Sequence, residues 1–140
     1  TKRLIEQYDA LTPRDLEGEE PPLHVNGALT LGENIGDLAG LSIAWQAYVS
    51  RLKEKGETAQ TAPAIDGLTA AQRFFTSWAR GWRTAIRREF AKQLLSIDPH
   101  SPAEFRCNQV VANMDSFAEA YDLAPDDALW IAPNERVRIW

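Results

Sequence analysis

Two carboxylates lie one helical turn apart in LGENIGDLAG (residues 31–40), the most apolar and glycine-rich stretch of the chain. On a helical wheel that starts at Glu33, an apolar stripe falls at about 60–140° and a face of mostly small residues at about 260–340°. Glu33 and Asp37 therefore point into the seam between two packing faces. A buried carboxylate needs a cation, a metal ion or several hydrogen-bond donors. Three glycines at i, i+4 and i+8 further indicate that another backbone approaches this helix closely.

Two interpretations of Glu33 remain open on spacing alone. Thr30 and Glu33 match the Ser/Thr-x-x-Glu pattern of a capping box, a common and purely structural device at helix starts. That interpretation explains the glutamate but not why Asp37 shares its seam. A metal-ligating carboxylate, with a second carboxylate one turn later to orient a histidine ligand, would use both residues.

A second chemical candidate lies in IDPHSPAEFR (residues 97–106). Ser101 is expected to cap a helix that begins at Pro102, so His100 precedes a helix N-terminus, where the dipole favours neutral imidazole. Arg106 follows about one turn into the helix, and the two side chains could converge on one anionic or carbonyl oxygen. A surface histidine beside an arginine in a salt bridge is the alternative, and spacing alone favours it.

Helix-start signals indicate which elements position these residues. Four capping-box patterns begin at Thr30, Thr69, Ser101 and Ser116. The chain is therefore predicted to be mainly α, with helices at about 3–10, 31–54, 70–95, 102–113 and 116–121. Polar stretches at 16–27 and 54–67 are expected to be loops. Two short apolar segments around Pro133-Asn134 predict a small hairpin or extended pair at the C-terminus.

Composition excludes several classes of protein. The 140 residues are enough for about one domain with a core of its own. A net charge of −5 without a clustered basic face argues against nucleic-acid binding. No apolar run approaches the ~18 residues of a membrane span, and the N-terminus lacks the apolar centre of a signal peptide. With Cys107 as the single cysteine, an internal disulfide is excluded.

Four segments together resemble a known family. LTLGENIGDLAGL, QRFFTSWARGWR, DPHSPAEFRCN and the terminal RVRIW are similar, in this order, to the C-terminal part of the neprilysin-like zinc metallopeptidases, peptidase family M13. The similarity runs from about Asn26 to Trp140. At the positions of Gly36 and Ala39 the family more often has alanine and glycine, so each departure exchanges one small residue for another. The absence of cysteines near the C-terminus points to a bacterial member.

The resemblance implies a role for each candidate and a fold, the helical C-terminal portion of a thermolysin-like catalytic domain. Glu33 would be the third zinc ligand, and Asp37 would hydrogen-bond a zinc-bound histidine. His100 would stabilise the oxyanion of the tetrahedral intermediate, and Arg106 would hold the substrate backbone. Trp82 matches an aromatic residue near the pocket for the residue that follows the scissile bond.

Helical spacing offers a structural alternative for Trp82. Phe74, Trp78 and Trp82 form an i, i+4, i+8 stripe, a pattern more typical of a core. Three other tryptophans are expected to be core residues or C-terminal anchors, and Cys107 is expected to be a small buried hydrophobe. These tryptophans are Trp45, Trp130 and Trp140.

One part of the zinc site has no counterpart in the sequence. A catalytic zinc of this type takes two histidines and a general-base glutamate from an H-E-x-x-H helix, and this chain has none. His24 and His100 lie far apart, and neither belongs to such a motif. We therefore expect residues 1–140 to be the C-terminal portion of the catalytic domain, with the histidine helix upstream. Alone, the chain is expected to be inactive and to bind Zn²⁺ weakly.

The expected partners follow from that assignment. They are peptide substrates, the N-terminal remainder of the same peptidase, and further copies of this chain once its glycine-rich face is uncovered. A secreted and a cytoplasmic bacterial location are both compatible with low cysteine use. Two other functions stay open, a non-catalytic helical interaction module and a peptidase paralogue that has lost its activity.

Overall fold

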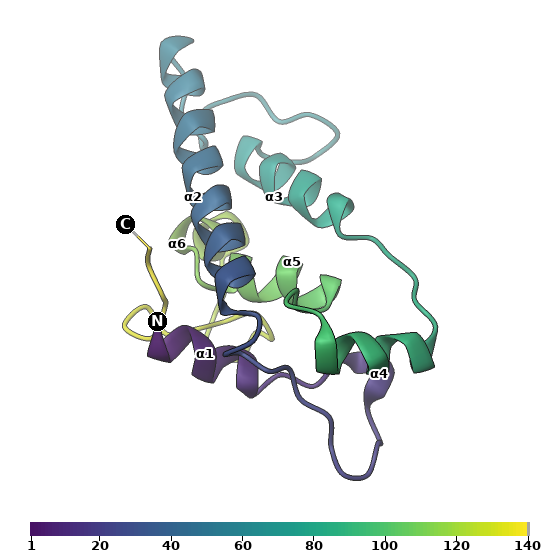
Figure 1. Ribbon diagram of the computed structural model, residues 1–140. Helices are drawn as coiled ribbons and strands as arrows, with labels where there is room; N and C mark the ends of the chain where they lie inside the picture. The colour runs from purple at the N-terminus through teal and green to yellow at the C-terminus, as the bar shows by residue number, and fades with distance from the viewer. Residues whose placement is uncertain (140) are drawn as a thin grey trace.

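A computed structural model describes residues 1–139 and confirms a mainly α fold. In Figure 1 the long helix α2 runs along the molecule, α5 packs against its N-terminal half, and α1 and α4 lie at the end where α2 begins. No strand is present in the described part of the chain, and none of its helices is long and apolar enough to cross a membrane. The elements are α1 (Lys2–Asp9), the 3-10 turn η1 (Arg14–Leu16), α2 (Leu31–Glu54), α3 (Ala70–Gly81), α4 (Arg88–Ile97), α5 (Ala103–Ala112) and α6 (Asp115–Ala120).

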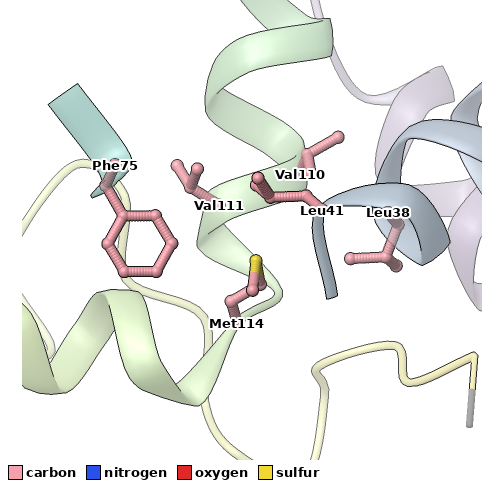
Figure 2. Close-up of a cluster of buried hydrophobic side chains, with 6 residues drawn as sticks. All are labelled: Leu38, Leu41, Phe75, Val110, Val111 and Met114. Carbon is pink, nitrogen blue, oxygen red and sulfur yellow. The ribbon is translucent and has the colours of Figure 1, made fainter. Parts of the chain in front are cut away.

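The apolar stripe of α2 forms the centre of the core. Leu38 and Leu41 form one cluster with Phe75 of α3, two valines of α5 and Met114, which precedes α6 (Figure 2). Trp45 stacks on Phe75 with ring centroids 5.2 Å apart and extends the core toward a second cluster around Leu52. The core role predicted for Trp45 is confirmed. The members of the central cluster are Leu38, Leu41, Phe75, Val110, Val111 and Met114.

The glycine-rich face of α2 differs from the sequence prediction. Gly32, Gly36 and Gly40 are exposed, and a Cβ added to any of them would meet no atom within 4 Å. Ile43 on the same side is 54% exposed. Within residues 1–139, therefore, no backbone makes the close approach that the three glycines indicated.

The predicted helix over 70–95 is wrong in its length, because the chain leaves the helical path between Gly81 and Arg88. Glycine lowers helix stability by about 1 kcal/mol relative to alanine, so a helix that continues through Gly81 is less stable at that residue. Beyond it, Arg88 and Lys92 bind the carboxylate of Glu19, with Arg88 Nε 2.9 Å and Lys92 Nζ 2.9 Å from Glu19 Oε1. These contacts hold α4 against the 13–20 segment, where a straight continuation of α3 could not reach.

Only one of the four predicted capping boxes forms. Gln72 N donates to Thr69 Oγ1 at 3.2 Å and Thr69 N donates to Gln72 Oε1 at 3.1 Å. Thr30 precedes α2 without a side-chain cap bond. Helix α5 begins one residue later than expected, with Pro102 as its N-cap, so Ser101 does not cap it. Helix α6 begins one residue earlier, with Met114 in place of Ser116 at the N-cap.

The C-terminal arm is held by a buried arginine. Arg136 Nη1 donates to Asp115 Oδ1 at 2.7 Å, its Nε donates to the Ile131 carbonyl at 2.9 Å, and its guanidinium lies 5.1 Å above the Trp130 ring. The arm turns at residues 133–135, but no strand ladder joins its two sides within the described chain. The hairpin alternative is therefore wrong. The anchoring role expected of Trp130 holds, while Trp140 lies outside the described residues.

Asp115→Asn should lower the melting temperature because it removes the carboxylate that pairs with buried Arg136, at a cost of about 1–3 kcal/mol. Burial alone would raise the pKa of Asp115, but hydrogen bonds from Arg136 and Arg138 hold that pKa below its ordinary value. The native state thus favours the ionised carboxylate, and its contribution is present above the unfolded pKa of about 3.9 and lost as the pH falls through the native value. Thermal unfolding should show the wild-type advantage at pH 5–8, and the advantage should shrink below about pH 4. An advantage that is equal at every pH would contradict the ion-pair assignment.

Candidate functional site

The candidate residues predicted from the sequence meet where the start of α2 faces the start of α5. Glu33 and Asp37 lie on the first two turns of α2, His100 on the segment before α5, and Arg106 on α5 itself. Trp82 joins them from the residue that ends α3. Side chains from three separate stretches of the sequence are thereby brought together.

Glu33 has no part in a capping box. No side-chain cap bond forms at the start of α2, so the capping interpretation of Glu33 is wrong. Its Oε2 lies 3.4 Å from His100 Nε2 and 3.7 Å from Arg106 Nη2. The side chain is 46% exposed. Glu33 therefore presents a carboxylate that is accessible and has two cationic or hydrogen-bonding neighbours.

Asp37 and Arg106 form a two-pronged ion pair between α2 and α5. Arg106 Nε donates to Asp37 Oδ2 at 2.6 Å and Nη2 donates to Oδ1 at 2.8 Å. The Arg106 side chain is only 18% exposed and the Asp37 side chain 12%. The hydrogen bonds from Arg106 to Asp37 raise the pKa of Arg106. A carboxylate has about four lone-pair sites, so each Asp37 oxygen retains the capacity for a further donor.

His100 is oriented by Asp98, a residue that is not among the candidates predicted from the sequence. His100 Nδ1 lies 2.7 Å from Asp98 Oδ1, and the backbone N–H of His100 donates to the same oxygen at 2.9 Å. These bonds, the backbone one first, hold the pKa of Asp98 below its ordinary value. The spacing of Asp98 and His100 in the sequence could have indicated this contact, because an aspartate side chain can accept a bond from the backbone N–H two residues later in a local turn. With Nδ1 engaged, Nε2 is the ring nitrogen that faces Glu33.

Trp82 is a wall of the site and not a core residue. Phe74 and Trp78 pack against the central core as the helical stripe predicted, but Trp82 lies past the end of α3. Its ring makes an edge contact with Trp78 at 5.2 Å, and the Arg106 guanidinium lies 4.5 Å from its centroid. Cys107, next to Arg106, was predicted to be a small buried hydrophobe but is only half-buried, and burial raises the pKa of its thiol.

A groove of about 950 Å³ adjoins these side chains. Trp82 and His100 line it at one side, and apolar residues of α4 and of the 82–87 connection form much of the rest. The apolar lining includes Ile86, Phe90, Ala91, Leu94 and Leu95. A groove of this size and character could receive apolar side chains of a ligand next to the polar cluster.

The described residues do not form a complete metal site by themselves. Within residues 1–139 no three histidine, cysteine, aspartate or glutamate side chains are arranged to hold a metal ion. His24 Nδ1 lies 3.1 Å from Thr12 Oγ1, and His24 takes no part in the ion pairs that join Glu33, His100 and Arg106. Any metal ion at Glu33 therefore needs ligands from outside these residues.

Comparisons with known proteins agree on one family. The model of peptidase family M13 matches residues 1–137. Neprilysin-1 of Caenorhabditis elegans is 36% identical over the whole chain, and the neutral endopeptidase of Lactococcus lactis is 32% identical over 99% of it. The chain spans 18% and 19% of the length of these two relatives. It thus corresponds to about a fifth of either one.

A solved structure extends the likeness to three dimensions. The cryo-EM structure of the zinc metalloprotease Zmp1 of Mycobacterium tuberculosis in its open state superposes with a TM-score of 0.91 at 57% identity. The match covers 99% of this chain and 21% of that one. PepO of Lactobacillus rhamnosis superposes with a TM-score of 0.74 at 31% identity.

Asp37→Asn should lower the free energy of unfolding by about 1–3 kcal/mol, because a partly buried guanidinium loses its charged partner. Arg106→Lys should have a similar effect, since an ammonium cannot make the two parallel bonds. Glu54→Gln is the matched control, because its ion pair with Arg51 is 60–69% exposed and should be worth little. Denaturant unfolding measures all three, and equal losses for Asp37→Asn and Glu54→Gln would contradict the assignment.

Proposed function

The chain belongs to peptidase family M13, and we propose that it forms the C-terminal portion of the catalytic domain of a bacterial zinc-dependent peptidase. One observation carries the proposal. Glu33, His100 and Arg106, which come from two distant stretches of the sequence, meet with Glu33 Oε2 3.4–3.7 Å from the other two side chains. The substrates would be peptides, and the residues of this chain would supply one zinc ligand and the groups that hold the substrate.

The carboxylate of Glu33 has the properties expected of a zinc ligand. Its carboxylate is accessible, it is free of the capping role, and catalytic zinc sites combine such a carboxylate with two histidines and one open position. The two histidines would come from an H-E-x-x-H helix outside this chain, as would the general-base glutamate. When bound, zinc lowers the pKa of its water and polarises a carbonyl oxygen. Asp37 would keep its bonds to Arg106 and accept one further bond from a zinc-bound histidine.

His100 would stabilise negative charge on a reacting carbonyl oxygen. Its Nδ1 is engaged with Asp98, so Nε2 is the ring nitrogen that could donate a hydrogen to an oxygen on which charge develops. Nε2 faces Glu33, so the donor and the proposed zinc ligand are on the same side of the site. A donor held in this way acts without reorganisation during the reaction.

Arg106 and Trp82 would hold the substrate backbone and flank its binding groove. Nε and Nη2 of Arg106 are bonded to Asp37, and in the described part of the chain Nη1 makes no hydrogen bond, which leaves it available for a peptide carbonyl. The apolar groove beside Trp82 would take the side chain that follows the scissile bond. Because Asp37 and the Trp82 ring fix the guanidinium, little freedom is lost when a peptide binds.

The remainder of the same protein is the proposed main partner of this chain. Apolar side chains of α2 and α4 are 52–63% exposed, and the glycine-rich face of α2 is open. Packing of other segments of the protein would cover these surfaces, and an isolated chain would associate through them. The exposed large apolar residues on these two helices are Ile43, Phe90 and Ile97.

Glu33→Gln in the full-length protein should abolish both zinc retention and peptide hydrolysis, because the neutral amide is a poor ligand and two histidines hold zinc weakly. Asp37→Ala should leave a site with zinc affinity lower by ~10–100-fold, and added zinc should restore part of the activity. Glu54→Gln, at the exposed C-terminal end of α2, is the control and should keep both properties. Elemental analysis after dialysis and a peptide assay measure these outcomes. Zinc retained at full stoichiometry by Glu33→Gln would refute the ligand role.

His100→Ala and Arg106→Ala should separate two effects on kinetics. His100→Ala should keep zinc and KM while kcat falls by ~10²–10³, since the lost donor acts in the transition state. Arg106→Ala should raise KM with a milder loss of kcat, because the guanidinium binds substrate in ground and transition states alike. Steady-state kinetics on one peptide decide between them, and the reverse pattern would exchange the two proposed roles.

A further inference from the structure

A line of buried hydrogen bonds runs behind the site. Ser101 Oγ donates to Asn34 Oδ1 at 2.7 Å, Asn34 Nδ2 donates to Thr30 Oγ1 at 2.9 Å, and Thr30 Oγ1 donates to the Asn26 carbonyl at 3.0 Å. Asn34, Thr30 and Ser101 are 1%, 3% and 4% exposed. Every donor in this line has an acceptor, so the three side chains form one connected and satisfied set.

The line connects the two residues that follow the proposed reactive groups. Asn34 comes directly after Glu33, and Ser101 directly after His100. On a helix, neighbouring side chains point about 100° apart, so Asn34 faces the interior while Glu33 remains accessible. The bond from Ser101 to Asn34 thus pins the first turn of α2 to the 98–101 segment just behind the 3.4 Å approach of Glu33 and His100.

Two hydroxyls next to helix starts make this connection. Thr30 is the N-cap of α2, where a hydroxyl ordinarily accepts a backbone N–H bond, and Ser101 lies directly before Pro102, the N-cap of α5. Neither hydroxyl makes a cap bond, and both are bonded to Asn34. Their hydrogen bonds therefore join the start of α2 to the segment before α5 and do not stabilise one helix alone.

We propose that Asn34 and Ser101 are positioning residues, whose hydrogen bond sets the separation between the zinc-ligating carboxylate of Glu33 and the imidazole of His100. This inference rests on the proposed function. A loosened bond would let the start of α2 and the 98–101 segment shift against each other. Transition-state stabilisation by His100 would suffer, because it depends on exact placement of the donor relative to the metal-bound groups. Ground-state binding through Arg106 would be affected less, since Asp37 holds Arg106 independently.

The test compares Asn34→Ala, Ser101→Ala and the double variant with Asn113→Ala in the zinc-loaded full-length protein. Asn113 is a matched control, because it is 3% exposed and bonds Gln7, Gln109 and Val137 away from the site. Zinc content, melting temperature, kcat and KM are measured for each variant at a temperature well below its unfolding. The Ser101→Ala change is mild, so it keeps the test open if Asn34→Ala does not fold.

We expect Ser101→Ala and Asn34→Ala to retain zinc, to keep KM within about twofold, and to lower kcat by about 10-fold. The double variant should lose no more kcat than the stronger single variant, because both substitutions remove the same hydrogen bond between Ser101 and Asn34. Asn113→Ala should lower the melting temperature to a similar degree and leave kcat unchanged. Site variants with wild-type kcat, or a kcat loss in Asn113→Ala equal to theirs, would overturn the positioning role. Wild-type protein without zinc-dependent hydrolysis would overturn the proposed function as well.

Discussion

The ion pair between Asp37 and Arg106 is the interaction on which the geometry of the site depends. It crosses from α2 to α5, the two helices whose packing forms the centre of the core, and it lies one turn from Glu33. Because both side chains are mostly buried, neither can move without leaving a charge unpaired in a poorly solvated place. The same arginine lies over Trp82, so the end of α3 is held by the same contact. Three helices are thereby fixed around one charged pair.

Around that pair, tertiary hydrogen bonds replace local ones. Thr30, the N-cap of α2, makes no cap bond, which is ordinarily worth about 1 kcal/mol, and it bonds Asn34, as does Ser101. Asp98 folds back on His100 and leaves one ring nitrogen facing the site. Helix α3 keeps its local cap, the complete capping box of Thr69 and Gln72. At the site, the hydroxyls of Thr30 and Ser101 serve the contact between α2 and the segment before α5.

The surfaces of the chain fit its relation to longer relatives. An open face of three glycines on α2 and exposed apolar side chains on α4 are unusual for a self-contained domain. The chain corresponds to about a fifth of the relatives it matches, and the proposed partner segments would lie on these faces. Glycine lowers helix stability relative to alanine, and close packing of the proposed neighbour on Gly32, Gly36 and Gly40 would offset that cost.

The sequence alone determined the class of the fold, the bounds of α2 and the family, and it predicted the candidate residues that the structure brings together. These features follow from local patterns, namely the 3.6-residue apolar period, the spacing of Glu33 and Asp37, and the motifs around His100 and Arg106. Tertiary structure decided what local patterns cannot encode. It broke the expected 70–95 helix, because Arg88 and Lys92 bind Glu19 across the molecule, and it took Thr30 and Ser101 away from their helices. It also paired Asp37 with Arg106 and moved Trp82 from the core to the site, since partners nearly 70 and more than 20 residues apart are brought together only by packing.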